Sequence, residues 1–254
     1  MDARQTPIAV ITGASSGIGA ATALRLADAG YRVVLTARRA DRLAELAERI
    51  SKNGGQAEAH ELDVTDRAAV DALAAGLDHC DVLFANAGGA IGADPVATGS
   101  ADDWRAMYEV NVIGTLNTVQ ALLPALIASG AGTIVLMGST AGFTAYEGGG
   151  GYVAAKHGEH AIAGTLRLEL FDQPVRVMEI APGMVKTDEF AVNRYRGNAD
   201  QAAAVYAGVA EPLTADDIAD AVTWAVTRPA HFNVDLMVLR PRAQAAQHKV
   251  FRQQ

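Results

Sequence analysis

The glycine-rich segment Thr12-Gly13-Ala14-Ser15-Ser16-Gly17-Ile18-Gly19 joins an apolar run to an alanine-rich run near the start of the chain. The run before it, Ile8 to Ile11, is typical of a buried parallel strand because it is apolar and rich in β-branched residues. The pattern after it is helical up to Ala29, and Gly30 is suited to the C-cap. Glycines at such a turn let the backbone approach a pyrophosphate, and the helix N-terminus supplies free N–H groups. The context therefore favours nucleotide binding over a purely structural turn.

Strand and helix patterns alternate along the rest of the 254-residue chain, without a composition break or a low-complexity tract. This alternation predicts a single α/β domain over residues 1–254, with a doubly wound parallel sheet of about seven strands and helices on both faces. The carboxyl ends of the strands then lie at one edge of the sheet, where such folds bind ligands. Weak periodicity in residues 184–212 indicates a substrate loop, and residues 240–254 form a polar tail.

The apolar runs and the helical patterns give approximate limits for the individual elements. Strands are expected at residues 8–11, 32–36, 56–62, 81–85, 132–137, 175–180 and 234–239. Further helices are expected at residues 42–51, 67–77, 102–129, 152–171 and 215–226. Asp41 and Asp66 precede the first two of these helices and are expected to be their N-caps.

The charge balance and the single cysteine argue against several classes of function. Lys and Arg number 21 and Asp and Glu number 29, a net charge of −8 without any basic block, which argues against nucleic acid as a partner. Cys80 is the only cysteine, so no internal disulfide can form and a reducing, cytoplasmic location is expected. Its apolar neighbours indicate a buried filler rather than a nucleophile. We expect no signal peptide in Met1–Pro7, no membrane span and no metal site.

Tyr152 and Lys156 are four residues apart in an expected helix and therefore lie on the same face, one turn apart. A free tyrosine has a pKa of about 10, and a nearby ammonium lowers that pKa because it favours the tyrosinate. The spacing can thus produce a tuned proton donor and acceptor. The pair alone is weak, because Tyr-x-x-x-Lys also occurs on solvated helix faces.

Arg38 and Arg39 follow the second expected strand, where an NAD-binding fold usually carries an acid for the ribose hydroxyls. No acid occurs there before Asp41. A guanidinium suits a 2′-phosphate because it can donate two parallel hydrogen bonds, so the pair favours NADP over NAD. Two solvated surface arginines are the alternative. We expect Arg38 to be the stronger contact, with Arg39 in solvent or stacked on the adenine.

Together these motifs resemble those of the short-chain dehydrogenase/reductase family, which has a Rossmann fold. The matching residues follow the family's order and span nearly the whole chain: the glycine segment, Asn86-Ala87-Gly88, Asn111, Ser139, Tyr152-x-x-x-Lys156 and Pro182-Gly183. Residues 179–185, 187–190 and 228–234 are similar to a narrower branch, the NADP-dependent 3-hydroxy acid (serine-type) dehydrogenases. The segment Leu239-Arg240-Pro241-Arg242 departs from the Asp-Gly-Gly turn that usually ends the last strand of the family's 3-oxoacyl-carrier-protein reductases.

The resemblance implies reversible hydride transfer between a nicotinamide and a carbonyl or secondary alcohol. Tyr152 would exchange a proton with the substrate oxygen, Lys156 would lower the tyrosine pKa and bind the nicotinamide ribose, and Ser139 would hydrogen-bond the same oxygen. Asn111 would hold a water that links Lys156 to solvent. The structural alternatives are a turn hydroxyl for Ser139 and a satisfied helix asparagine for Asn111.

The resemblance also implies contacts with NADP(H) and with the substrate. The expected cofactor contacts are Gly13, Ser15, Ser16, Gly17, Ile18, Gly19, Arg38, Arg39, Asp63, Val64, Asn86, Ala87, Gly88, Tyr152, Lys156, Pro182, Gly183, Val185 and Thr187. Within this set Asp63 and Val64 would contact the adenine, Asn86 would brace the sheet edge and Thr187 would reach the carboxamide. The expected substrate contacts are Phe143, Tyr146, Met184, Arg194 and Arg196.

The favoured substrate is a 3-hydroxy acid or a similar small hydroxy compound. A broad aldehyde/ketone reductase of secondary metabolism is the alternative among enzymes, and a non-catalytic dinucleotide-binding regulator is the alternative outside them. Family members commonly pair through two long helices, so we expect a homotetramer, with a dimer as the alternative.

Overall fold

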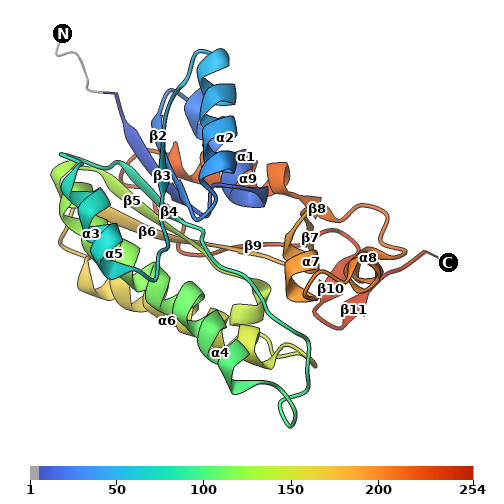
Figure 1. Ribbon diagram of the computed structural model, residues 1–254. Helices are drawn as coiled ribbons and strands as arrows, with labels where there is room; N and C mark the ends of the chain where they lie inside the picture. Colours follow the sequence, from blue (N-terminus) through green and yellow to red (C-terminus); the bar gives the residue numbers. More distant parts are fainter. Residues whose placement is uncertain (1–5, 254) are drawn as a thin grey trace.

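A computed structural model describes residues 6–253, so most of Met1–Pro7, and the signal-peptide expectation made for it, lies outside the described residues. The main element is a parallel sheet of seven strands in the order β3-β2-β1-β4-β5-β6-β9 (Figure 1). The strands are β1 (Ile8–Thr12), β2 (Arg32–Ala37), β3 (Gln56–Glu61), β4 (Val82–Ala85), β5 (Gly132–Met137), β6 (Val175–Pro182) and β9 (Met237–Leu239). The predicted doubly wound α/β sheet is confirmed, and each expected strand lies close to its expected position.

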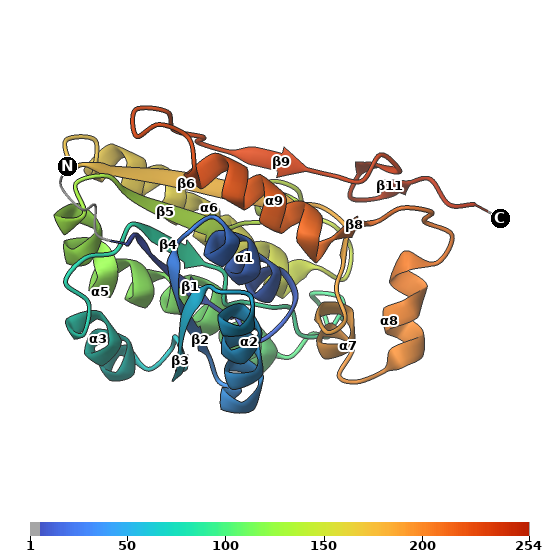
Figure 2. The ribbon, with the colours of Figure 1, turned by 90° about the horizontal axis from the view of Figure 1, so that it is seen from above.

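Helices cover both faces of the sheet (Figure 2). One face carries α1 (Gly17–Asp28), α2 (Ala40–Lys52) and α9 (Ala215–Val226). The other carries α3 (Arg67–Ala75), α5 (Gly114–Ala128) and α6 (Gly150–Glu169), with α4 (Ala101–Tyr108) beside α6. Such an arrangement buries both faces of the central strands, which explains why β1, β4 and β5 are buried along their whole length, whereas the edge strand β3 is polar and largely exposed.

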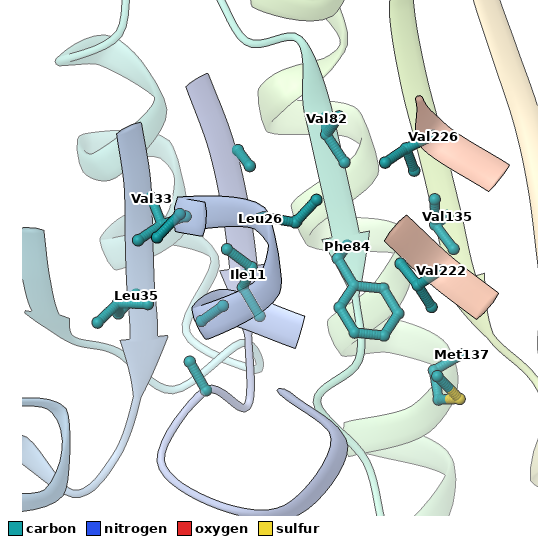
Figure 3. Packing of buried hydrophobic residues seen from close by; sticks show 14 of the residues in the cluster. Ile11, Leu26, Val33, Leu35, Val82, Phe84, Val135, Met137, Val222 and Val226 are labelled. Atoms are coloured by element: carbon teal, nitrogen blue, oxygen red, sulfur yellow. The ribbon is translucent and has the colours of Figure 1, made fainter. Parts of the chain in front are cut away.

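Alternate residues of the same strand fill the two layers. In β1, Ile11 packs with the α1, α2 and α9 layer, whereas Val10 packs with the opposite layer. Figure 3 shows part of the hydrophobic layer between the sheet and α1, α2 and α9, to which α1 contributes Leu26, β4 contributes Phe84 and α9 contributes Val222. Each fully buried side chain of this size contributes roughly 1.5–3 kcal/mol, so the two layers fix the strands and the loops that follow them.

The strand order reverses beside β1, because the chain moves outward to β2 and β3 and then returns to β4 on the other side of β1. In such sheets the crevice at the carboxyl ends of the central strands binds ligands. Four short strands and two short helices gather beyond this edge, at the right of Figure 1. They are β7 (Val185–Lys186), α7 (Phe190–Arg194), α8 (Ala199–Tyr206), β8 (Leu213–Thr214), β10 (Gln244–Ala246) and β11 (Lys249–Val250).

Several local expectations are corrected. The loop expected at residues 184–212 contains α7 and α8, and the tail forms an antiparallel pair, β10 with β11. Asp66 does cap its helix, accepting a hydrogen bond from the Ala69 backbone at 3.1 Å. Asp41 does not, because the helix begins at Ala40, two residues earlier than expected, and Arg39 takes the extended N-cap conformation. Asp41 then lies in the first turn, where a carboxylate favours the positive end of the helix.

The single long helix expected at residues 102–129 is interrupted by a turn of π-helix, Glu109–Ile113, between α4 and α5. Such turns often occur at functional sites. The whole stretch Ala101–Ala128 is long and apolar enough to span a membrane by length and composition, which differs from our reading of the sequence. However, 56% of its most apolar window is buried in the protein, where α5 packs against the sheet. A buried core helix passes the same test, so the stretch is accounted for by the fold.

Cys80 is fully buried in the same layer as α5, and burial raises the pKa of its thiol to about 12. This confirms that Cys80 is a core residue rather than a nucleophile.

Candidate active site

A cavity of about 370 Å³ opens at the carboxyl ends of β1, β4, β5 and β6. Residues that are far apart in the sequence meet in its wall. The site residues predicted from the sequence that line this cavity are Gly13, Ser16, Gly17, Ile18, Asn86, Ala87, Gly88, Ser139, Tyr146, Tyr152, Lys156, Pro182, Gly183, Met184, Val185, Thr187 and Arg194.

The glycine segment forms a tight turn between β1 and α1. Gly13 and Gly17 have φ angles of +65° and +53°, which favour glycine. A Cβ at Gly19 would lie only 2.7 Å from the side-chain nitrogen of Asn86, so no side chain fits there. Ser16 precedes α1 without a side-chain hydrogen bond to it, so the first N–H groups of the helix are available to an anion. The turn fits the diphosphate of a dinucleotide.

Asn86 ties the end of β4 to this turn. Its side-chain amide donates to the backbone oxygen of Thr12 at 2.9 Å. In return, the Thr12 hydroxyl accepts hydrogen bonds from the backbone N–H groups of Asn86 and Ala87, both at 2.9 Å. These bonds fix the spacing of the two strand ends on either side of the crevice.

Tyr152 and Lys156 lie one turn apart on α6, with the Lys156 Nζ atom 5.9 Å from the centre of the tyrosine ring. Ser139 follows β5 on the same cavity wall, where its hydroxyl accepts a hydrogen bond from the Ala141 backbone at 3.1 Å. The ring of Phe190 packs edge-on against Tyr152, with the ring centres 5.8 Å apart. The three polar groups therefore face one space beside an apolar wall.

Burial raises the pKa of Tyr152 above its usual value, while Lys156 and Ser139 act in the opposite direction. The expected effect of Lys156 is thus correct in sign, but burial outweighs it. Tyr152 holds its proton at neutral pH, as a proton donor requires.

Lys156 is itself buried, with 4% of its surface exposed. Its Nζ atom donates to the backbone oxygen of Met137 at 2.7 Å and to the Glu159 carboxylate at 2.5 Å. Burial lowers the pKa of the ammonium, but Glu159 and the neighbouring groups more than offset this, so its pKa is raised. Lys156 is therefore charged at neutral pH.

Asn111 is fully buried in the π-helical turn. Its amide nitrogen donates to the backbone oxygens of Met107 at 2.7 Å and Gly89 at 3.0 Å, and its oxygen accepts from the Gly89 N–H at 3.2 Å. A Cβ placed on Gly88 would lie 2.5 Å from the Asn111 oxygen and 3.7 Å from the Lys156 nitrogen. Both side chains thus border the same glycine.

Arg38 and Arg39 behave differently from the expectation. Arg38 is exposed, whereas Arg39 turns back toward the glycine segment and donates to the hydroxyls of Ser15 and Ser16, at 2.9 and 3.0 Å. Arg39 is the N-cap residue of α2, where its backbone is extended. From this position its side chain is directed back to the glycine turn. Arg39 was expected in solvent or stacked on the adenine; its side chain is 41% exposed, but its guanidinium is held at the glycine turn rather than free in solvent.

The two residues expected at the adenine lie outside the cavity wall. Asp63 accepts hydrogen bonds from the Thr65 backbone and hydroxyl at 2.9 and 2.8 Å. Burial raises the pKa of this carboxyl, but the two bonds and the charge of Arg38 outweigh it, so the pKa is lowered. Val64 is 6% exposed and packs with Leu62 and Val70, which leaves little side chain for a ligand.

Only some of the residues expected at the substrate lie in the cavity wall. Tyr146, Met184 and Arg194 line the cavity. Phe143 instead packs edge-on against His160, with the ring centres 4.4 Å apart. Arg196 forms an ion pair with Asp103 of α4 and is not part of the cavity wall.

The sequence did not single out several side chains of the cavity wall, among them Glu189 and Phe190 within the expected substrate loop, and Gln244 and Gln247 in the tail. The Gln244 side chain accepts from the Met184 backbone at 2.8 Å, and Gln247 accepts from the Thr140 hydroxyl at 3.0 Å. The tail offers no periodic pattern, so nothing in the sequence indicates that it reaches the site. Among residues 6–253 no group of three or more His, Cys, Asp or Glu side chains is arranged to hold a metal ion.

A doubly wound sheet with a phosphate-binding turn, and a Tyr–Lys–Ser group in the adjoining cavity, define a dinucleotide-dependent oxidoreductase. The sequence profile of the short chain dehydrogenase family matches residues 7–196. The chain belongs to this family.

The chain is 52% identical to an uncharacterized oxidoreductase of Mycobacterium tuberculosis, over 94% of this chain and 92% of the relative. It is 36% identical to the NADP-dependent 3-hydroxy acid dehydrogenase of Salmonella typhi, over 94% of this chain and 96% of the relative. Among solved structures, the closed form of serine dehydrogenase complexed with NADP+ superposes with a TM-score of 0.90 at 34% identity, covering 97% of this chain and all of that one (100%).

Proposed function

We propose that this protein is an NADP(H)-dependent oxidoreductase that transfers a hydride between the nicotinamide and the carbonyl carbon of a small molecule. The observation that carries the proposal is the meeting of Tyr152, Ser139 and Lys156 with the glycine turn in one cavity. When bound, the cofactor supplies or accepts the hydride, and the protein supplies position and protons.

In reduction, Tyr152 gives its phenolic proton to the carbonyl oxygen, and in oxidation it takes the proton back from the alcohol. The Ser139 hydroxyl donates a hydrogen bond to the same oxygen and stabilises its developing charge. Lys156 opposes the effect of burial on the phenol. The proximity of Asn111 and Lys156 at Gly88 supports a role for Asn111 in the path from Lys156 to solvent.

The cofactor preference rests on Arg39, Ser15 and Ser16. A guanidinium beside two hydroxyls suits the 2′-phosphate that distinguishes NADP from NAD. The NADP dependence named for the Salmonella relative, and the NADP+ named in the serine dehydrogenase structure, support the same preference.

For the substrate we favour a 3-hydroxy acid or a similar small hydroxy compound, which the names of these two proteins support. Besides Lys156, Arg194 is the only cationic side chain among the described residues of the cavity wall. It donates to the Tyr146 hydroxyl at 3.1 Å and to the backbone oxygens of Gly92 and Gly148 at 3.2 and 3.0 Å. These three bonds leave two of its five N–H groups for a substrate carboxylate.

A broad aldehyde/ketone reductase is the second candidate, because the wall also contains apolar surface from Met184, Phe190 and Val205. A regulator without turnover is less favoured, since such proteins usually lack one of the catalytic side chains and all four are present here.

We also propose a homotetramer, with a dimer as the alternative, and a cytoplasmic location. Phe171 and Leu168, at the end of α6, are 84% and 78% exposed, which supports an apolar contact between copies there. Light scattering at micromolar protein would contradict the assembly if it gave the mass of one chain. The free, buried Cys80 supports a reducing compartment.

A substrate panel tests the catalytic proposal. The purified protein is assayed with 3-hydroxy acids, serine, simple secondary alcohols and the matching ketones, each with NADP(H) and NAD(H). We expect turnover, a preference for NADP(H), and higher kcat/KM for acids than for neutral analogues. Absence of turnover across the panel would contradict the enzymatic proposal, and equal rates for acids and neutral analogues would favour the broad reductase.

A further inference from the structure

Lys156 has a buried carboxylate as its partner, and the catalytic scheme above does not use that carboxylate. Glu159 lies one helical turn after Lys156 on α6, is 1% exposed, and contacts the ammonium at 2.5 Å. The side chain of Thr115, on α5, also favours the charged form of this carboxylate and so lowers its pKa. Glu159 is thus sealed beneath the active site rather than presented to the substrate.

A second carboxylate, that of Glu179 on β6, lies close enough to Glu159 to act on its charge and is also 1% exposed. One of its oxygens accepts a hydrogen bond from the Nδ1 atom of His160 at 2.7 Å, and the other has no hydrogen-bond partner among residues 6–253. A Cβ placed on Gly138, directly before Ser139, would lie 3.0 Å from the Glu179 Cγ atom. Two buried carboxylates therefore share the space beneath Lys156 and the Ser139 loop.

Stability does not account for this arrangement. Removing charges from water is costly, and replacing a buried ion pair by well-packed apolar residues is often neutral or stabilising. Burial raises the pKa of Glu159 to about 7, against the opposing effect of Lys156, and Glu179 raises it further. The groups that face Glu159 are Lys156 on its own helix, Glu179 on β6 and the Thr115 hydroxyl on α5, with Tyr152 within electrostatic reach.

Electrostatics connects this group to the reaction. The ammonium of Lys156 favours the tyrosinate form of Tyr152, and an anion in contact with the ammonium works against it. Above neutral pH Glu159 is ionised, so its charge acts on the phenol through the range in which Tyr152 titrates.

We propose that Glu159, supported by the Glu179–His160 pair, is a positioning residue for proton transfer: its carboxylate holds the Lys156 ammonium in place and offsets part of the positive field that this ammonium exerts on Tyr152. Tyr152 consequently keeps its proton to a higher pH, which suits it to donate a proton in the reducing direction. The inference rests on the proposed function, because it concerns the proton that Tyr152 exchanges.

The test replaces Glu159 by Gln, which keeps the shape of the side chain and removes its charge. Ionisation of Tyr152 is followed by ultraviolet difference spectroscopy in the absence of substrate, with the Tyr152→Phe protein subtracted to isolate this residue. We expect the Tyr152 titration to move to lower pH by about one unit, which is about tenfold more tyrosinate at a given pH below the titration midpoint. The basic limb of the kcat/KM profile for alcohol oxidation should move by a similar amount.

Three further variants separate charge from structure. Glu159→Asp keeps the charge and should restore most of the parental titration. Glu179→Gln should move the Tyr152 titration in the same direction as Glu159→Gln, but by less. This variant replaces Glu159→Gln in the test if Glu159→Gln does not fold. Glu169→Gln, an exposed acid on the same helix, should leave the titration unchanged.

No shift, or a shift to higher pH, in both Glu159→Gln and Glu179→Gln would overturn the inference. A parent protein without turnover on any substrate would instead contradict the proposed function, while the spectroscopic titration would still report on Glu159.

Discussion

Arg39 holds the carboxylate of Glu189, 150 residues further along the chain, through two hydrogen bonds of 2.8 Å each. The same guanidinium contacts the Ser15 and Ser16 hydroxyls of the glycine turn. The segment that leads into α7 is therefore tied to the place where a 2′-phosphate is expected. Glu189 presents to Arg39 the same two-oxygen geometry that a phosphate would present.

Glu189→Gln is predicted to tighten NADP+ binding, because it removes a carboxylate that competes with the phosphate for Arg39. Both side chains are partly exposed, so solvent screens the pair and the gain should be modest, on the order of threefold to tenfold in Kd. NAD+ binding should change much less. Calorimetric titration of the parent and Glu189→Gln with both cofactors measures this, and weaker NADP+ binding in Glu189→Gln would show that the carboxylate assists rather than competes.

Arg39→Ala is predicted to weaken NADP+ binding more than Arg38→Ala does. Arg39 faces the glycine turn, whereas Arg38 is exposed. Loss of one charge-assisted contact in Arg39→Ala should raise the Kd for NADP+ roughly 10- to 100-fold. The two variants are matched controls for each other, since each removes one guanidinium from the same loop. A larger loss from Arg38→Ala would restore the ranking expected from the sequence.

Tyr152→Phe is predicted to lower kcat by about 10³-fold or more, because it removes the proton donor and leaves the ring in place. Cofactor affinity should be largely kept, since the phosphate-binding turn is separate from the phenol. Steady-state kinetics with NADPH and the best substrate of the panel, together with a cofactor titration, checks both parts. Near-normal turnover would mean that another group supplies the proton.

The sequence was sufficient for the sheet and for the motifs at the ends of its strands. Apolar runs and glycine turns are local signals, and the parallel sheet brings their ends together by topology alone. Thus Gly13, Ser139 and Tyr152, which are distant in sequence, could be assigned to one site before any coordinates were known.

Contacts between side chains of distant segments could not be predicted. Whether Arg38 or Arg39 faces the turn depends on the backbone at the α2 N-cap, which was expected at Asp41 and lies two residues earlier, at Arg39. Glu189 and Gln244 reach the cavity from segments without periodicity. Nothing in the sequence indicated a role for Glu159, and the structure shows that it is buried on α6, with 1% of its surface exposed.

The stability of the fold is predicted to fall as pH rises from about 4.5 to 7, through Glu159. The pKa of this carboxyl is about 7 in the folded protein and 4.5 as a free group, so the folded state binds more protons in that window. Glu189 and Asp216 have lowered pKa values, so their contribution is instead lost at more acidic pH. Urea unfolding at several pH values should show the decline in the parent and a flatter curve in Glu159→Gln. Parallel curves would mean that Glu159 titrates normally.

Arg194 distinguishes the two candidate substrate classes. If a substrate carboxylate binds to its remaining N–H groups, Arg194→Ala should lower kcat/KM for a hydroxy acid by roughly 10- to 100-fold more than for its methyl ester. Arg196→Ala is the control from the same segment, and it should leave the ratio of acid to ester unchanged because Arg196 pairs with Asp103. Arg194 also holds Tyr146 and two backbone oxygens, so its loss will disturb the wall for both substrates. The ratio removes that common effect, and an unchanged ratio in Arg194→Ala would leave the broad aldehyde/ketone reductase as the better description of this site.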